Sequence, residues 1–392
     1  MQYKRVFKLK PYWGTFLKGI REQRQELNGS DLDSNENRKR PSCYYTWDNQ
    51  NWIFGSHSCV INPDQVSLFI DEDLENIYHR KKLALKIFYW NRYPLFVDLR
   101  DCDLGEGLKA VETTIIQNIL AFENFAPRVY DLVFLTDGEY NYLTQITEFI
   151  EKPFSEFPYD TIVHDDPWWE KVHEYCRKYF LVPYDLDERN VRNKKITDFE
   201  NYIFRGDFKT QLISTIKQGL SFGGDTDILY QSIYELGIPG RRNNLSRLPF
   251  LSFNNLPPNF TTLDIGCNGG FFLRRAADYG STRLVGTDLP VVIEASRFLN
   301  TYLGYFNIDF TSENIPQKEF DLVFFMSMIN YLSNPEPIFA KTKHLLYFEG
   351  HGGSKAKDYL PLLEKYFKKI EELGYVDDYP EGGPRVVLRC WK

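Results

Sequence analysis

Two aspartates on either side of a glycine-rich turn have a spacing that points to ligand chemistry. Asp264 lies near the end of the strand-like run TTLDI, and the turn from Gly266 to Gly270 follows it directly. Asp288 ends the next apolar run. Glycines leave bare backbone that a ligand can approach, and an acid after a strand can accept hydrogen bonds from ribose hydroxyls. The pattern predicts a nucleoside-binding site.

The elements around this turn are predicted from their periodicity. Residues 262–265 indicate a short buried strand, and residues 271–279 indicate a helix that Gly280 ends in a left-handed cap. Residues 283–287 then indicate a second strand. In such a strand, helix, strand unit, both acids lie at the carboxyl ends of neighbouring parallel strands.

The position of Asp264 distinguishes this turn from a dinucleotide fingerprint. The fingerprint G-x-G-x-x-G holds a pyrophosphate at a helix N-terminus, and an acid two residues before the first glycine would repel it. The acid suits instead a ligand with an ammonium group and no phosphate. The turn D-x-G-x-N-x-G resembles motif I of the class I S-adenosylmethionine-dependent methyltransferases, [DE]-x-G-x-G-x-G, with Asn268 replacing the middle glycine.

The resemblance implies an α/β fold over residues 245–392, with a Rossmann-like seven-stranded methyltransferase sheet whose last strand is antiparallel. It also implies S-adenosyl-L-methionine as cofactor. Further strands are expected at 306–310, 320–325, 345–348, 375–379 and 385–391, and helices at 291–303, 338–344 and 359–373. The expected cofactor-binding residues are Asp264, Gly266, Cys267, Asn268, Gly270, Phe271, Asp288, Leu289, Glu313 and Met326.

Two side chains after the expected fifth strand could accept a proton. Methyl transfer to a hydroxyl requires such a base, so we predict His351 and Glu349 as catalytic residues. In the alternative interpretation His351 caps a loop and Glu349 pairs with a lysine. Upstream, Arg241, Arg242 and Arg247 could face an anionic acceptor or lie solvated on a surface turn. No metal is expected in this domain.

A second set of polar residues lies in the N-terminal half. Asp185, Asn190 and Asp198 have the spacing of D-x-x-x-x-N followed by D-F-G, which resembles the catalytic and metal-binding motifs of the protein-kinase-like superfamily. The resemblance implies that the first aspartate orients a hydroxyl and that Asn190 and Asp198 hold the Mg²⁺ of Mg-ATP. Lys86 and Glu112 are the candidates for the phosphate-binding lysine and its ion-pair partner. Because P-Y-D replaces H-R-D and no glycine-rich loop is visible, we expect weak ATP binding or none.

The segments around these residues suggest an α+β kinase-like domain over 44–205 with a short C-lobe. The expected elements are strands at 66–70, 82–89, 94–99, 129–135 and 142–149, and helices at 108–123 and 168–180. Strands, a helix and a strand pair form the layout of a kinase N-lobe. Residues 206–244 are expected to form a helical linker or cap, with helices at 207–220 and 226–236.

Composition limits the remaining classes. The 392 residues are 43% hydrophobic and 16% aromatic, which excludes wholesale disorder. A net charge of -7 argues against a general nucleic-acid binder, and six cysteines without a C-x-x-C pair do not indicate a zinc site or a disulfide scaffold. Residues 1–43 form a basic, polar extension that could contact an anionic membrane peripherally. No apolar run is long enough to span a bilayer, so we expect a cytoplasmic protein.

We therefore predict an S-adenosylmethionine-dependent methyltransferase that methylates a hydroxyl of a glycan, glycolipid or small molecule. One alternative is a bifunctional kinase/methyltransferase acting on a polysaccharide end. Another is a tRNA-modifying methyltransferase, because the G-C-N form of motif I also occurs in wobble-uridine enzymes. A fourth is a non-catalytic regulator.

Overall fold

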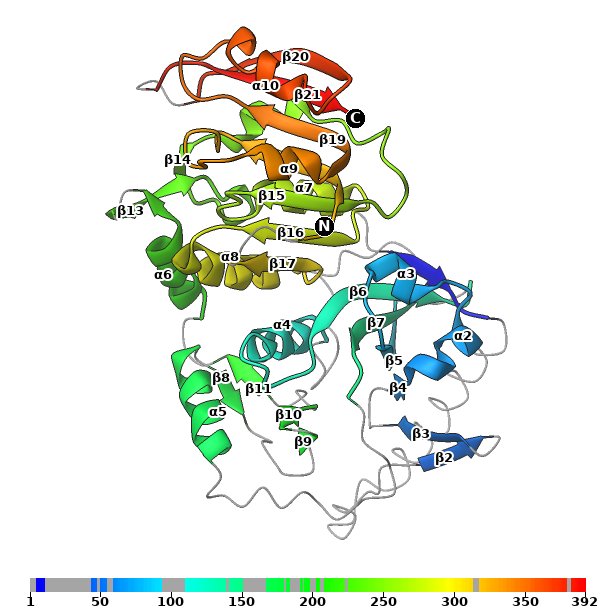
Figure 1. Cartoon of the computed structure of the whole chain (residues 1–392). Helices are drawn as coiled ribbons and strands as arrows, with labels where there is room; N and C mark the ends of the chain where they lie inside the picture. Colours follow the sequence, from blue (N-terminus) through cyan, green and yellow to red (C-terminus); the bar gives the residue numbers. More distant parts are fainter. Residues whose placement is uncertain are drawn as a thin grey trace. The chain divides into compact units, whose positions relative to one another are not determined.

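The computed structural model divides the chain into two compact units, residues 1–206 and residues 207–392, which we describe separately (Figure 1). The structure describes residues 5–10, 44–47, 50–54, 59–93, 110–138, 141–150, 167–179, 181–183, 191–192, 194–197, 202–204, 208–222, 225–312, 317–378 and 382–392.

The second unit is built on a seven-stranded sheet in the order β17-β16-β15-β18-β19-β21-β20 (Figure 1). Its strands are β15 (Thr261–Ile265), β16 (Arg283–Thr287), β17 (Ile308–Thr311), β18 (Phe320–Met326), β19 (Thr342–Glu349), β20 (Lys369–Val376) and β21 (Arg385–Trp391). β15 to β19 pair in parallel, and β21 runs antiparallel to both of its neighbours. The strand count and the antiparallel last strand confirm the predicted sheet.

Helices cover both faces of this sheet, as a buried parallel sheet requires. Along β18, Leu322 and Phe324 pack with α7 (Phe271–Asp278) and α8 (Pro290–Tyr302). The alternate residues Val323 and Phe325 pack with α9 (Glu336–Ala340) and α10 (Leu360–Leu363). Since successive strand residues point to opposite faces, the apolar run is buried on both sides.

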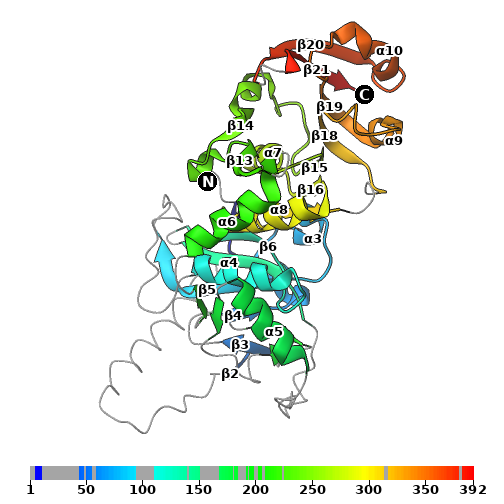
Figure 2. The ribbon, with the colours of Figure 1, turned by 90° about the vertical axis from the view of Figure 1, so that its left-hand side faces the viewer.

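Residues 207–244 belong to the same compact unit as the sheet. The predicted first helix is confirmed as α6 (Phe208–Leu220), which lies beside α8 (Figure 2). The predicted second helix is wrong, because residues 225–231 form the strand β13 (Asp225–Gln231). This strand pairs with β12 (Ser221–Phe222) and β14 (Gly240–Arg242). The pairing overrides the helical spacing of the apolar residues.

Two boundaries near the C-terminus also differ from the prediction. The expected helix at 359–373 is only α10, because residues from Lys369 onward pair with β21. The helix expected at 338–344 ends at Ala340, and β19 begins at Thr342. In both places sheet pairing determines the conformation of a segment whose apolar spacing also suits a helix.

The first unit has the predicted layout of strands, one helix and a strand pair. Its seven-stranded sheet has the order β1-β6-β7-β5-β4-β3-β2. The strands are β1 (Val6–Lys8), β2 (Tyr44–Trp47), β3 (Gln50–Phe54), β4 (Cys59–Ile61), β5 (Leu83–Tyr93), β6 (Val129–Thr136) and β7 (Asn141–Glu148). Between β5 and β6 the chain forms α4 (Ala110–Ala121), which confirms the predicted helix.

After β7 come α5 (Pro167–Lys178) and short paired strands. β8 (Leu181–Pro183) pairs with β11 (Tyr202–Phe204), and β9 (Val191–Arg192) pairs with β10 (Lys195–Ile196). Among the described residues before β5, the short helical elements are η1 (Pro63–Gln65), α2 (Val66–Phe69) and α3 (Leu74–Tyr78).

Two predictions in the first unit are corrected. The strand expected at 66–70 is the helix α2, which continues from a turn that begins at Pro63. Its buried residues Val66, Phe69 and Ile70 have helical spacing. The N-terminal extension also contributes to the core, since Phe7 and Leu9 are buried. The strand expected at 94–99 lies outside the described residues.

No helix among the described residues is both long and apolar enough to cross a membrane.

Candidate functional site

The glycine turn lies directly after β15 and adopts a backbone that glycine favours. Gly266 has φ 71° and Gly270 has φ 78°, and Asn268 is a non-glycine residue with φ 44°. The N–H groups of Gly266 and Cys267 donate to the carbonyl of Thr287 at 2.9 and 3.1 Å. The turn is therefore fixed to the end of β16.

Side chains from two helices hold the turn from the other side. Arg274, a buried residue of α7, donates to the carbonyl of Gly269 and to Asn300 Oδ1. Asn300 Nδ2 donates to the same carbonyl at 3.1 Å, and Ser296 Oγ donates to the carbonyl of Asn268 at 2.6 Å. Because the carbonyls of the turn are bound by the protein, its conformation is set before any ligand arrives.

The carboxylate of Asp264 is buried at the end of β15 without a compensating partner. The residue is 1% exposed, and its Oδ2 accepts no hydrogen bond from any described residue. Burial raises the pKa of this carboxyl well above its ordinary value, and the nearby Asp288 raises it further. A buried carboxylate oxygen with no donor is costly, so this atom suits a cationic group or a hydrogen-bond donor of a ligand.

Asp288 lies at the end of β16 and binds backbone amides. Its Oδ2 accepts from the N–H of Asn268 and its Oδ1 from the N–H of Leu289, each at 2.8 Å. Burial raises the pKa of this carboxyl, and the two backbone donors partly counteract the rise. Each oxygen keeps a second lone pair for a ligand hydroxyl. Leu289 is 67% exposed, so its side chain is not part of the core.

The chain that leaves β18 passes over the glycine turn. A Cβ on Gly266 would lie 2.2 Å from Met328 Sδ, so Met328 would have to move, and the positive φ of this residue also favours glycine. Ile265 pairs with Phe325, and Met326 pairs with Glu349. The ends of β15, β18 and β19 therefore lie next to one another at the carboxyl edge, where open α/β sheets bind ligands.

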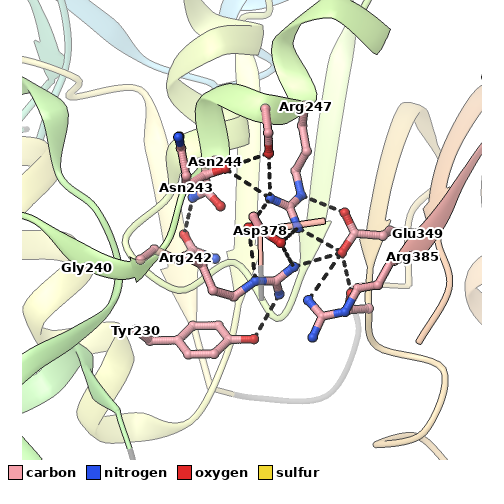
Figure 3. A network of polar contacts seen from close by, with 12 residues as sticks. Tyr230, Gly240, Arg242, Asn243, Asn244, Arg247, Glu349, Asp378 and Arg385 are labelled. Carbon is pink, nitrogen blue, oxygen red and sulfur yellow. Dashed lines mark hydrogen bonds and ion pairs between the residues drawn. The ribbon is translucent and has the colours of Figure 1, made fainter. Parts of the chain in front are cut away.

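Glu349 ends β19 inside a buried ion-pair network (Figure 3). Arg242 Nη2 lies 2.9 Å from its Oε1, and Arg247 Nε lies 2.6 Å from its Oε2. Both arginines also bind Asp378, with Arg247 Nη1 at 2.7 Å from Oδ2. Arg385 Nη1 lies 3.7 Å from Glu349 Oε1. The network joins the segment before the glycine turn to the ends of β19 and β20.

This environment argues against the predicted proton-accepting role of Glu349. The arginines, Arg247 first, lower the pKa of the Glu349 carboxyl despite its complete burial, and Ser327 Oγ also donates to it. The same two arginines lower the pKa of Asp378. A carboxylate with a lowered pKa is a poor base at neutral pH. We therefore assign Glu349 a positioning role, and Arg242 and Arg247 are buried rather than solvated.

His351 is available for chemistry on the loop that follows β19. Its backbone is fixed by Tyr359 Oη, which accepts from the His351 N–H at 3.0 Å. No hydrogen bond joins its imidazole to a side chain of the described residues. The ring centre of Tyr331 lies 6.4 Å from the imidazole, and Tyr331 is 71% exposed.

The other predicted cofactor-binding residues divide into three groups. Cys267 and Phe271 are buried, and burial raises the pKa of the Cys267 thiol well above its ordinary value, so this cysteine is an inert packing residue. Met326 is half-buried at the end of β18. Glu313 lies outside the described residues.

The kinase-like candidates are described only in part. Lys86 lies on β5 and is 7% exposed, with its Nζ 5.6 Å from the ring centre of Phe88. Glu112 lies on α4, but no ion pair of the described residues joins it to Lys86, so the expected pair is not formed. Asp185, Asn190 and Asp198 lie outside the described residues.

The sheet order and the glycine turn define a Rossmann-like nucleoside-binding domain. Residues 263–351 match the family model for a methyltransferase domain, so the C-terminal part of the chain contains such a domain. The match confirms the predicted class and, with it, S-adenosyl-L-methionine as the cofactor. No curated protein matches the chain significantly.

Two solved structures that match part of the chain are a protein named as a kinase-methyltransferase and a domain with SAH bound. The bifunctional kinase-methyltransferase WbdD is 21% identical, with a TM-score of 0.35, over 45% of each chain. The N-terminal domain of EvdMO1 with SAH bound is 14% identical, with a TM-score of 0.35, over 47% of this chain and 96% of its own. The alignment spans less than half of the WbdD chain.

Proposed function

We propose that the second unit transfers a methyl group from S-adenosyl-L-methionine to a hydroxyl of a glycan, glycolipid or small molecule. The observation that carries this proposal is the buried, unpartnered Oδ2 of Asp264 beside a preformed glycine turn. A dinucleotide or ATP would bring phosphates to this acid, whereas the methyl donor brings an ammonium group and a sulfonium.

Three parts of the chain would hold the cofactor. Asp264 would accept hydrogen bonds from the ammonium group, and Asp288 would accept them from the ribose hydroxyls. Leu289, which is 67% exposed, would cover the adenine ring. When bound, the cofactor supplies an activated methyl group and leaves as S-adenosylhomocysteine.

The chain's contribution to the reaction is alignment and proton removal. The acceptor oxygen must lie in line with the methyl carbon, with water excluded. As the new O–CH₃ bond forms and the C–S bond breaks, the hydroxyl proton would pass to the imidazole of His351 and then to solvent. Glu349 would hold the loop of His351 through Ser327, whose Oγ donates to Glu349 Oε1 and lies 3.3 Å from the carbonyl of Gly350.

The experiment is methyl transfer with a carbon-13 methyl label on S-adenosyl-L-methionine. Acceptor probes would be methyl glycosides of common hexoses, a glycolipid extract and bulk tRNA, each assayed by NMR for a new methyl signal. The proposal predicts a methoxy signal on a hydroxyl-bearing probe that requires His351. Labelled methyl groups on tRNA nucleobases alone would contradict it and support the tRNA alternative.

A second candidate function, phosphotransfer by the first unit, is favoured by one observation. Lys86 is buried on a central strand, and its ammonium group has no carboxylate partner among the described residues. A buried lysine without an anion is unfavourable unless a ligand supplies one, and a nucleotide phosphate would do so. We propose that the first unit binds Mg-ATP weakly.

Calorimetry with Mg-ATP tests this second candidate. Binding that Lys86→Met removes, with Lys81→Met as the control because Lys81 is exposed, would support a nucleotide site. If no heat of binding is measured at millimolar Mg-ATP, the proposed nucleotide site of the first unit is contradicted.

A further inference from the structure

The loop after β18, residues 326–335, carries an exposed aromatic side chain to the side of His351. Tyr331 is 71% exposed, and its ring plane is inclined at 57° to the imidazole. Its backbone N–H donates to the carbonyl of Met328 at 3.0 Å, which places it in a tight turn. Because the ring is outside the core, its position is not explained by packing.

The same loop reaches the cofactor side of the site. The Met328 side chain lies against Gly266, where a Cβ would come within 2.2 Å of Met328 Sδ. Ser327 has φ 60°, an uncommon conformation for a serine, and its hydroxyl binds Glu349. Such a backbone persists where the surroundings fix it, and here the buried ion-pair network does so. The loop therefore extends from the glycine turn to His351.

The two loops at this edge carry no acidic residue, lysine or arginine. Residues 326–335, MSMINYLSNP, and residues 350–354, GHGGS, contain no lysine, arginine, aspartate or glutamate. Around Tyr331, the polar side chains that are exposed belong to Asn330, Ser333 and Asn334. Lysine and arginine, the side chains that neutralise a phosphate, are absent from both loops, whereas amides, hydroxyls and an aromatic face suit a neutral ring that carries hydroxyl groups.

We propose that Tyr331 and His351 form the acceptor subsite and that the acceptor is a neutral saccharide ring. The C–H face of the sugar packs on the exposed ring of Tyr331, and one sugar hydroxyl points to the His351 imidazole. Asn330 and Asn334 can pair with the remaining hydroxyls. This inference rests on the proposed methyltransferase function and specifies the acceptor of that site.

The test measures binding of methyl glycosides of neutral hexoses and 6-deoxyhexoses to the full chain saturated with S-adenosylhomocysteine. Titrations by NMR would compare the wild type with Tyr331→Ala, Tyr331→Phe and Tyr279→Ala. Tyr279 is a matched control, because it is 63% exposed but follows α7 at the opposite edge of the sheet. We expect Tyr331→Ala to weaken glycoside binding by about tenfold or more, since loss of a stacked aromatic anchor costs that much.

Tyr331→Phe should bind within about threefold of the wild type, because the ring face is kept. Tyr279→Ala should leave glycoside binding unchanged. Unchanged affinity for S-adenosylhomocysteine in all variants would show that the fold is intact. Equal glycoside affinity of Tyr331→Ala and the wild type would overturn the inference. Absence of binding by every glycoside, or displacement of bound glycoside by tRNA, would overturn it too.

The failure of this inference is distinguishable from failure of the proposed function. A wild-type chain that does not bind S-adenosylhomocysteine contradicts the methyltransferase itself. A chain that binds S-adenosylhomocysteine normally but no glycoside contradicts the acceptor assignment alone.

Discussion

At the scale of single residues, the cofactor assignment depends on one buried carboxyl. Asp264 combines burial, an unpartnered oxygen and a raised pKa. A bound cation would supply the missing partner and lower the pKa of the carboxyl. Asp288 differs, because its two oxygens are already bound by backbone amides. We therefore expect Asp264 to determine which ligand binds and Asp288 to orient it.

Asp264→Asn should weaken S-adenosylhomocysteine binding by about 10- to 100-fold, the value of a hydrogen bond to a charged group. The raised pKa also predicts a pH dependence with a definite sign. The ligand's ammonium group favours the ionised carboxylate, so affinity should rise with pH from the ordinary aspartate range, about 3.9, through the raised pKa.

Isothermal titration at several pH values measures this dependence. The Asn variant should show a flat profile over the same range, because it has no carboxyl to ionise. Parallel profiles for the two proteins would show that Asp264 does not contact the ligand's cation.

His351→Ala should lower the rate of methyl transfer by about 10²- to 10⁴-fold, because a positioned base contributes that much. Its affinity for S-adenosylhomocysteine should stay unchanged, since the imidazole acts on the acceptor. His344→Ala is the matched control, because His344 lies on β19, the strand that leads to the loop of His351, and its side chain is half-exposed. Equal kcat for the two variants would remove His351 from the mechanism.

At the scale of elements, the ion-pair network is what joins the segment before the glycine turn to the acceptor loops. Arg242 and Arg247 come from β14 and the turns after it, Glu349 from β19, and Asp378 from the chain after β20. A buried ion pair need not make the protein more stable than apolar residues at the same positions would. It does fix these segments in one arrangement relative to one another. The arrangement it fixes includes the loop of His351.

Arg247→Ala should destabilise the protein by about 3–5 kcal/mol, because it leaves buried carboxylates without a partner. Arg389→Ala is the control, since the Arg389 pair with Glu371 is partly exposed and should contribute at most about 1 kcal/mol. Urea unfolding measures both values. A similar small loss in the two variants would mean that water replaces the missing guanidinium of Arg247.

The same network predicts acid sensitivity. The pKa values of Glu349 and Asp378 are lowered in the folded state. Their contribution to the stability of the fold is therefore complete above the ordinary pKa values of about 4.3 for glutamate and 3.9 for aspartate. It is lost as the pH falls through the lowered values. Thermal melting of the wild type should therefore decline more steeply below about pH 4 than that of a chain with Arg247→Met and Glu349→Leu together.

At the scale of the whole molecule, each of the two units has its own hydrophobic core. A ligand that binds one unit should stabilise that unit, by about 2.7 kcal/mol at a concentration of 100 Kd. Scanning calorimetry with S-adenosylhomocysteine should shift one unfolding transition upward. At the same ligand concentration the shift should be smaller with Asp264→Asn, because this variant binds the ligand more weakly. An equal shift of every transition would indicate a single cooperative unit.

The local parts of this organisation could be predicted from the sequence, and the long-range parts could not. The unit from Asp264 to Asp288 was predictable because its strand, turn and helix signals are contiguous. The partners of Glu349 were not, because Arg242 and Arg247 are more than a hundred residues away in the chain. The sequence identified these three residues as polar candidates, but it left open whether the arginines face an anionic acceptor or lie solvated on a surface turn.

The errors in secondary structure have a common cause. Residues 225–231 and 369–376 have apolar residues that suit a helix, and strand pairing with distant segments decides their conformation. At residues 66–69 the reverse holds, because the segment V-S-L-F, which was expected to be a strand, follows a proline that begins a helical turn. The solvent exposure of Tyr331 also could not be predicted from the sequence. This aromatic residue lies near Ile329 and Leu332 in the chain, and yet its side chain is exposed.

The most direct test of the central claim is calorimetric titration of the full chain with S-adenosylhomocysteine, NAD and Mg-ATP, repeated with Asp264→Ala and Asp288→Ala. The account predicts that S-adenosylhomocysteine binds the wild type and that each substitution removes this binding. NAD should not bind, and any Mg-ATP binding should be unaffected by either change. Binding of NAD that Asp288→Ala abolishes, without binding of S-adenosylhomocysteine, would contradict the account.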